Sequence, residues 1–131
     1  MESRNKGKIL IVDDEMMIRK LFSTLIAMSC PELDIEQAEN GREAVDKFSS
    51  GHHGVIIMDL MMPVMDGICA FEAISELCDE KDWEMPPVVF CTGFAPPDSV
   101  HDIVGDGTYH GLLHKPVFGD KIIDALTARL D

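Results

Sequence analysis

Basic residues are scarce in this chain of 131 residues, which has 11 lysines and arginines against 24 aspartates and glutamates and a formal net charge of −13. Contacts with nucleic-acid phosphates need clustered lysine and arginine. The densest basic group, Arg4, Lys6 and Lys8, lies at the amino terminus, where we expect residues 1–7 to form a flexible, solvated leader. The charge balance therefore argues against a surface that contacts nucleic acid.

Long apolar runs are also missing. The longest stretches fall far short of the roughly 20 residues that a helix needs to cross a bilayer. The amino terminus has no apolar segment of the kind that directs secretion. We therefore expect a cytoplasmic protein that does not contact membranes.

Metal-ligand spacing of the zinc type is absent as well. His52 and His53 stand between glycines, in a segment that we interpret as a solvated turn rather than a metal site. The cysteines lack the paired spacing of zinc ligands, so free thiols in a reducing cytosol explain them better than disulfides or zinc. These cysteines are Cys30, Cys69, Cys78 and Cys91.

What the chain does have is a regular alternation of strand-like and helix-like patterns. At 46% hydrophobic and 27% charged residues, it fits one compact domain without a linker or a second domain. Five such alternations predict helices on both faces of a parallel sheet, a three-layer α/β/α sandwich. The predicted strands cover residues 9–12, 34–38, 55–58, 88–91 and 110–114.

Each helical pattern places apolar side chains on one face at the spacing of a helix. The residues expected to face inward are Ile18, Leu21, Phe22, Leu25 and Ile26 in the first helix, and Phe118, Ile122, Ile123, Leu126 and Leu130 in the last.

Four of the strand-like runs end on residues with related chemistry. Asp13 and Asp14 follow the first run, and Asp59 follows the third. Thr92 and Lys115 follow the fourth and the fifth. In parallel sheets of this kind the ligand lies beyond the carboxyl ends of the strands, so these side chains should converge on one crevice. Three carboxylates, a hydroxyl and an ammonium suit a divalent cation together with a phosphoryl group.

Each residue of this set has a defined role under that interpretation. Asp13 and Asp14 could cap the helix that follows them, but two acids facing Asp59 would repel it unless a cation were present. Oxygen ligands favour Mg²⁺ or Mn²⁺. Asp59 is the best-placed nucleophile, since a carboxylate can attack phosphorus to form an acyl phosphate. Lys115 would neutralise charge on the phosphoryl group during transfer, and Thr92 would donate a hydrogen bond to one of the phosphoryl oxygens.

At this point a resemblance to a known family is plain. The chain resembles the receiver domain of a two-component response regulator, of the chemotaxis-regulator type, along essentially its whole length. The motifs that carry the resemblance are Val12-Asp13-Asp14-Glu15, Met58-Asp59-Leu60-Met61-Met62-Pro63-Val64-Met65-Asp66-Gly67, Thr92 and Lys115-Pro116.

The resemblance implies a flavodoxin-like, doubly wound sheet of order 2-1-3-4-5, for which a chemotaxis regulator of this family is a standard example. It implies that Asp59 accepts a phosphoryl group from a phosphohistidine on a histidine kinase or a histidine phosphotransfer protein. Asp13, Asp14, Asp59 and the backbone carbonyl of Met61 would hold Mg²⁺.

The resemblance further implies a conformational switch. Phosphorylation would draw Thr92 inward and repack the face made by the fourth helix, the fifth strand and the fifth helix, through which members of the family also form homodimers. The peptide between Lys115 and Pro116 would be cis, an isomer that only proline adopts readily.

Three departures from the family pattern stand out. Leu112 occupies the position where an aromatic ring usually moves with the threonine, which puts aromatic-switch signalling in doubt. Gly93 replaces the alanine common after the threonine. Met61 and Phe94, two residues after Asp59 and Thr92, would border the path of attacking water, and their bulk suggests a long-lived phosphoryl group.

We therefore expect a signalling module rather than an enzyme that turns over a substrate. The sequence also disfavours two alternative functions. A phosphohydrolase of the haloacid dehalogenase type needs a second aspartate two residues after the nucleophile, where this chain has Met61. A receiver-like scaffold that signals without phosphate is disfavoured by the intact acidic, threonine and lysine positions.

Overall fold

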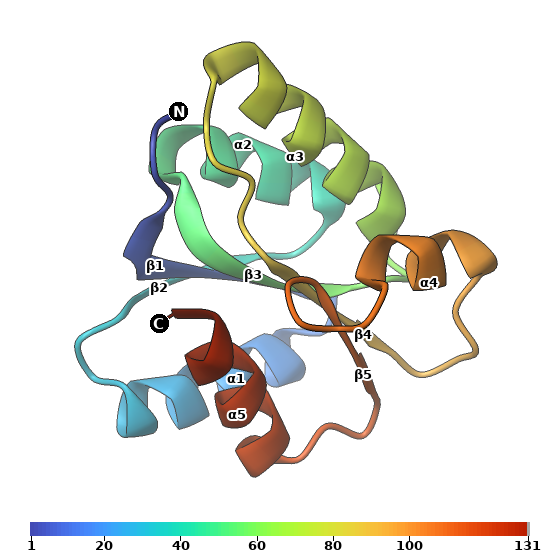
Figure 1. The fold of residues 1–131 in the computed structure, drawn as a ribbon. Coiled ribbons are helices and arrows are strands. Elements are labelled where there is room, and N and C mark those ends of the chain that lie inside the picture. The colour runs from blue at the N-terminus through green and yellow to red at the C-terminus, as the bar shows by residue number, and fades with distance from the viewer. Residues whose placement is uncertain (131) are drawn as a thin grey trace.

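The computed structural model describes residues 1–130, in which five strands alternate with five helices (Figure 1). Within this range no helix is both long and apolar enough to cross a membrane. The strands are β1 (Asn5–Val12), β2 (Asp34–Ala38), β3 (His53–Asp59), β4 (Val88–Thr92) and β5 (Gly111–His114). The helices are α1 (Met16–Ser29), α2 (Gly41–Gly51), α3 (Gly67–Lys81), α4 (Asp98–Val104) and α5 (Gly119–Leu130).

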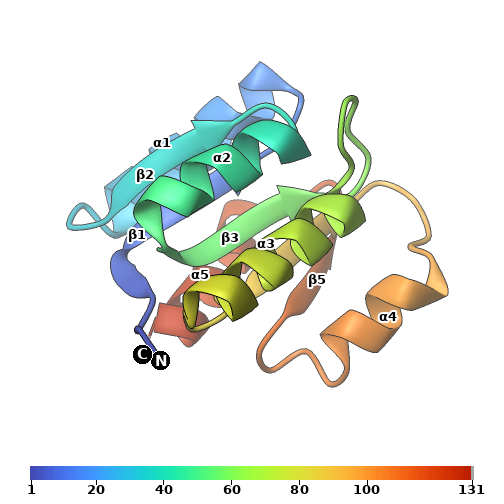
Figure 2. The same ribbon diagram turned by 90° about the horizontal axis from the view of Figure 1, so that it is seen from above.

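The strands form one parallel sheet in the order β2-β1-β3-β4-β5, which confirms the predicted fold. Helices α1 and α5 cover one face, and α2, α3 and α4 lie on the other (Figures 1 and 2). This arrangement follows from right-handed crossovers, because each helix must return the chain to the starting edge of the sheet. All the carboxyl ends of the strands therefore lie along one edge.

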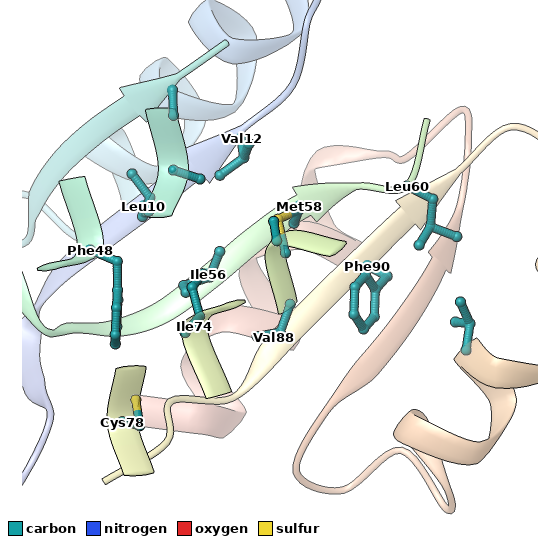
Figure 3. Close-up of a cluster of buried hydrophobic side chains, with 14 residues drawn as sticks. Leu10, Val12, Phe48, Ile56, Met58, Leu60, Ile74, Cys78, Val88 and Phe90 are labelled. Carbon is teal, nitrogen blue, oxygen red and sulfur yellow. The ribbon is translucent and has the colours of Figure 1, made fainter. Parts of the chain in front are cut away.

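Successive side chains of each central strand enter two different cores, because side chains alternate across a sheet. Leu10 and Ile56 pack beneath α2 and α3 in the cluster of Figure 3, whereas Ile9, Ile11 and Val55 pack beneath α1 and α5. All seven residues of β3 are buried. Two-sided burial is the reason that this strand reads as a continuous apolar run rather than an alternating one.

The amino-terminal segment is more tightly bound than the sequence suggested. The prediction of a leader over residues 1–7 is wrong for residues 5–7, because β1 begins at Asn5. The side chain of Arg4 is only 7% exposed. It donates hydrogen bonds to the carbonyls of Gly54 and Arg129, each at 3.0 Å. Arg4 thus joins the start of β3 to the end of α5.

The histidine pair after α2 is also buried, which corrects the prediction of a solvated turn. His52 stacks on Trp83 with 4.3 Å between ring centroids and places Nε2 2.9 Å from the carbonyl of Glu84. His53 is fully buried, and its Nε2 lies 2.7 Å from a carboxylate oxygen of Glu36. Both rings therefore belong to the packing at the amino-terminal edge of the sheet.

The inward faces of the outer helices are narrower than predicted. In α1, Phe22 and Ile26 are buried, but Leu21 is 49% exposed. Ile122 in α5 is fully buried, whereas Phe118 precedes the helix and is 69% exposed. The spacing of apolar residues shows which face of a helix points toward the core. Residues at the margin of that face, such as Leu21, are still partly exposed to solvent.

His110 precedes β5 rather than belonging to it, and it is half-buried between two aromatic rings. Its Nδ1 accepts a hydrogen bond of 3.0 Å from the backbone N–H of Val88. Burial, together with the charge of Arg129, lowers the pKa of His110 from 6.5 to about 4. The folded protein therefore holds this ring neutral.

We expect this histidine to make stability depend on pH. Because its pKa is lower in the folded state, the unfolded chain binds the proton more strongly, and the stabilisation present above about pH 6.5 is lost as the pH falls toward 4. In His110→Asn, an amide oxygen can replace Nδ1 as acceptor without titrating. Urea unfolding should show that the free energy of unfolding falls more between pH 7.5 and pH 5 in the wild type than in His110→Asn. Equal decreases in the two proteins would contradict this prediction.

Candidate phosphoryl and metal site

The carboxyl ends of β1, β3, β4 and β5 meet at one hollow of about 230 Å³. The register of the sheet causes this convergence, because Asp59 pairs with Cys91 and Thr92 pairs with His114. The predicted site residues are therefore brought together from segments far apart in sequence. The hollow is lined by Asp14, Glu15, Asp59, Met61, Thr92, Gly93, Phe94 and Lys115.

The acidic residues form a compact cluster at this hollow. Asp13 and Asp59 are buried and Asp14 is exposed, yet each offers an oxygen within 4.8 Å of the others. Burial, and then the charge of Asp13, raise the pKa of the Asp59 carboxyl. An array of three carboxylate oxygens with this mutual repulsion suits a hard divalent cation. The cluster could therefore hold a metal ion such as Mg²⁺.

Lys115 reaches this cluster from the end of β5. Its Nζ lies 3.0 Å from Oδ2 of Asp13 and 3.4 Å from Oδ2 of Asp59. Burial lowers the pKa of Lys115, but the hydrogen bond to Asp13 and the charges of both carboxylates outweigh it, so the pKa is raised. The following peptide to Pro116 is cis, as the resemblance implied. The lysine is thus a fixed positive charge beside the acids.

Thr92 is buried, and its hydroxyl takes part in a local turn. The Oγ1 donates to the carbonyl of Phe94 at 3.0 Å and lies 3.1 Å from the backbone nitrogen of the same residue. The backbone N–H of Lys115 donates to the carbonyl of Thr92 at 2.7 Å. Thr92 lines the hollow, and the hydrogen bonds of its hydroxyl remain within the β4–α4 loop.

Two of the three departures from the family pattern, namely Gly93 and the pair Met61 and Phe94, lie at the hollow, and one does not. Met61 and Phe94 line it, and their side chains are 62% and 69% exposed. The backbone N–H of Met61 also approaches Oδ1 of Asp59 at 3.4 Å. Leu112 instead packs against the core beneath α3 and α4, opposite Phe90 in the register of β4 and β5.

Two residues near the site had no role in the sequence interpretation. A Cβ atom at Gly67 would lie 2.4 Å from the backbone oxygen of Asp59, so this position requires the missing side chain. Arg19 donates to the main-chain carbonyl of Asp13 at 2.7 Å. The glycine was visible at the end of the acceptor motif, but its contact with Asp59 depends on how α3 meets β3.

Gly67→Ala should therefore destabilise the fold, although alanine favours helices and α3 begins at this residue. Because the obstructing atoms are backbone, we expect overpacking to lower the free energy of unfolding by about 2 kcal/mol. Gly93→Ala is the matched control, since nothing lies within 4 Å of a Cβ there. Urea unfolding measures both, and a Gly67→Ala protein as stable as Gly93→Ala would contradict the prediction.

Comparisons with known proteins agree with this geometry. The family model of the response regulator receiver domain matches residues 9–127. The chain is similar to the chemotaxis protein CheY of Listeria monocytogenes (32% identity over 119 residues, 91% of this chain and 94% of the relative). It is also similar to CheY of Bacillus subtilis (27% over 124 residues, 95% and 98%).

Among solved structures, that of the chemotaxis protein CheY4 of Vibrio cholerae superposes with a TM-score of 0.75 at 28% identity, covering 94% of this chain and 98% of that one. The sheet order, the acidic cluster and the family match thus point the same way. The chain belongs to the response regulator receiver domain family of two-component systems and is CheY-like.

Proposed function

We propose that Asp59 is the phosphoacceptor of this receiver domain and takes a phosphoryl group from a phosphohistidine on a histidine kinase or a histidine phosphotransfer protein. The observation that carries the proposal is the convergence of acids, hydroxyl and ammonium on one hollow in a chain of this family. The module acts as a switch that modifies itself, rather than as an enzyme that turns over a free substrate.

The transfer follows from the chemistry of Asp59. One carboxylate oxygen attacks phosphorus, the new P–O bond forms as the P–N bond breaks, and the imidazole of the donor keeps the electron pair of the broken bond. The carboxylate must be ionised to attack, and Lys115 at 3.4 Å supports that form. Lys115 also compensates negative charge on the phosphoryl oxygens as they approach.

The metal proposed for this reaction is Mg²⁺, or Mn²⁺ in its place. Asp13, Asp14, Asp59 and the backbone carbonyl of Met61 would hold it, and it would supply positive charge against the phosphoryl oxygens. The donor set fits, because its ligand atoms are oxygens and the acids already lie within reach of one another.

Signalling would begin at Thr92. A phosphoryl oxygen would compete with the carbonyl of Phe94 for the threonine hydroxyl, so the β4–α4 loop would lose a local hydrogen bond when the phosphorylated form switches. Because Leu112 replaces the aromatic residue, the loop rather than a ring rotation would carry the change to the α4–β5–α5 face. That face is the proposed surface for a partner or for a second copy of the chain.

Incubation with acetyl phosphate and Mg²⁺ tests the phosphoacceptor directly. Intact mass measurement should show one phosphate-sized increment on the wild type and none on Asp59→Asn, which keeps the size of the side chain but removes the nucleophile. An increment on both proteins would place the acceptor elsewhere. No increment on either would favour a scaffold that signals without phosphate.

The side chains of Met61 and Phe94 should prolong the life of the phosphoryl group, since they line the hollow through which water must enter. We expect Met61→Ala and Phe94→Ala each to speed hydrolysis by about tenfold, equivalent to about 1.4 kcal/mol in the barrier. Phe118→Ala is the matched control, because this phenylalanine is equally exposed, at 69%, but does not line the hollow. Loss of the phosphate increment with time gives the rates.

A wild-type half-life of seconds would contradict the long-lived form. Equal rates in Phe94→Ala and Phe118→Ala would also contradict it, because the effect would then not depend on a side chain that lines the hollow.

A further inference from the structure

Every polar group of Asp13, in the main chain and in the side chain, takes part in a hydrogen bond. Its backbone N–H donates to the carbonyl of Ala38 at 3.1 Å, and its Oδ1 accepts from the backbone N–H of Glu15 at 2.9 Å. Its Oδ2 accepts from Lys115 at 3.0 Å. The last group, the main-chain carbonyl, accepts from a guanidinium N–H of Arg19 at 2.7 Å. Only this last bond comes from a side chain whose role in the site is unassigned.

Arg19 reaches Asp13 because of its place in α1. The backbone N–H of Arg19 donates to the carbonyl of Glu15 at 3.1 Å, within the first turn of the helix. Side chains on a helix tilt toward its amino terminus, so a long side chain here extends back over that turn. Glu15, the residue that precedes the helix, makes no side-chain capping bond. The half-buried Arg19 therefore ties the β1–α1 turn from within the helix.

The bonded carbonyl belongs to the peptide that connects Asp13 to Asp14. A peptide unit is planar, so fixing its oxygen also fixes the direction toward the next Cα atom. Asp13 is already held by its other bonds, whereas Asp14 is exposed. The orientation of this one peptide thus sets where the Asp14 carboxylate lies relative to those of Asp13 and Asp59.

We propose that Arg19 is a positioning residue for the metal site: it holds the Asp13–Asp14 peptide so that the Asp14 carboxylate can share one divalent cation with Asp13 and Asp59. The inference rests on the proposed function in one respect, namely that the acidic cluster binds Mg²⁺. Residues that orient metal ligands through hydrogen bonds commonly change metal affinity by 10-fold to 100-fold when replaced.

The charge of Arg19 allows positioning to be distinguished from simple electrostatics, because the two predict opposite changes in Mg²⁺ affinity when Arg19 is replaced. A guanidinium near the cluster repels Mg²⁺, so its removal would strengthen binding if Arg19 acted through charge alone. Loss of positioning would weaken binding instead. Lys20 offers a matched control, because it is the next residue of α1, carries the same charge and is exposed.

The experiment is calorimetric titration of Mg²⁺ into the intact wild type, Arg19→Met, Arg19→Lys and Lys20→Met, with folding checked by circular dichroism. We expect Arg19→Met to weaken Mg²⁺ binding about tenfold. Arg19→Lys should recover most of the loss, because an ammonium can donate to the same carbonyl. Lys20→Met should bind as the wild type does or slightly more tightly. Phosphorylation by acetyl phosphate should be slowed in Arg19→Met at low Mg²⁺ and approach the wild-type rate at saturation.

Binding of Mg²⁺ to Arg19→Met as tight as to the wild type, or tighter, would overturn the inference while leaving the proposed function intact. A phosphorylation defect that persists at saturating Mg²⁺ would also overturn it. If Arg19→Met fails to fold, Arg19→Gln takes its place and is judged by the same Mg²⁺ affinity. A wild type that does not bind Mg²⁺ at all would overturn the proposed function itself.

Discussion

Mutual repulsion among carboxylates at the ends of two buried strands is the constraint on which this structure depends. Asp13 and Asp59 are both buried, and burial together with the neighbouring charge raises the pKa of the Asp59 carboxyl. Lys115 supplies one compensating charge, 3.0 Å from Asp13 and 3.4 Å from Asp59. One ammonium against three acids leaves the cluster negative, which favours the binding of a divalent cation.

Such a cluster needs a rigid support, because repelling charges would otherwise move apart. The two cores on either side of the sheet provide it, since β3 is buried along its full length and carries Asp59 at its end. Gly67 lets α3 pack directly against the backbone of that same residue. The position of the Asp59 carboxylate is therefore set by the packing of β3 and α3 rather than by the loop that follows it.

The fold and most of the site were predictable because their signals are local. Buried parallel strands are short apolar runs, and the residue after each run is at the ligand edge by topology alone. Arg4, His52 and His53 were not predictable, since their burial depends on partners at distant positions, such as Arg129, Trp83 and Glu36. The contact of Arg19 was not predictable either, because its acceptor is a main-chain carbonyl, which every residue type carries.

The bond from Arg4 to the carbonyl of Arg129 brings the beginning and the end of the described chain together (Figure 2). Both lie at the edge of the sheet where β1 starts, whereas the acids lie at the edge where the strands finish. An affinity handle attached near either end of the described chain would consequently lie at the opposite edge of the sheet from the acidic cluster. A short linker that joins these two ends would likewise lie away from the hollow.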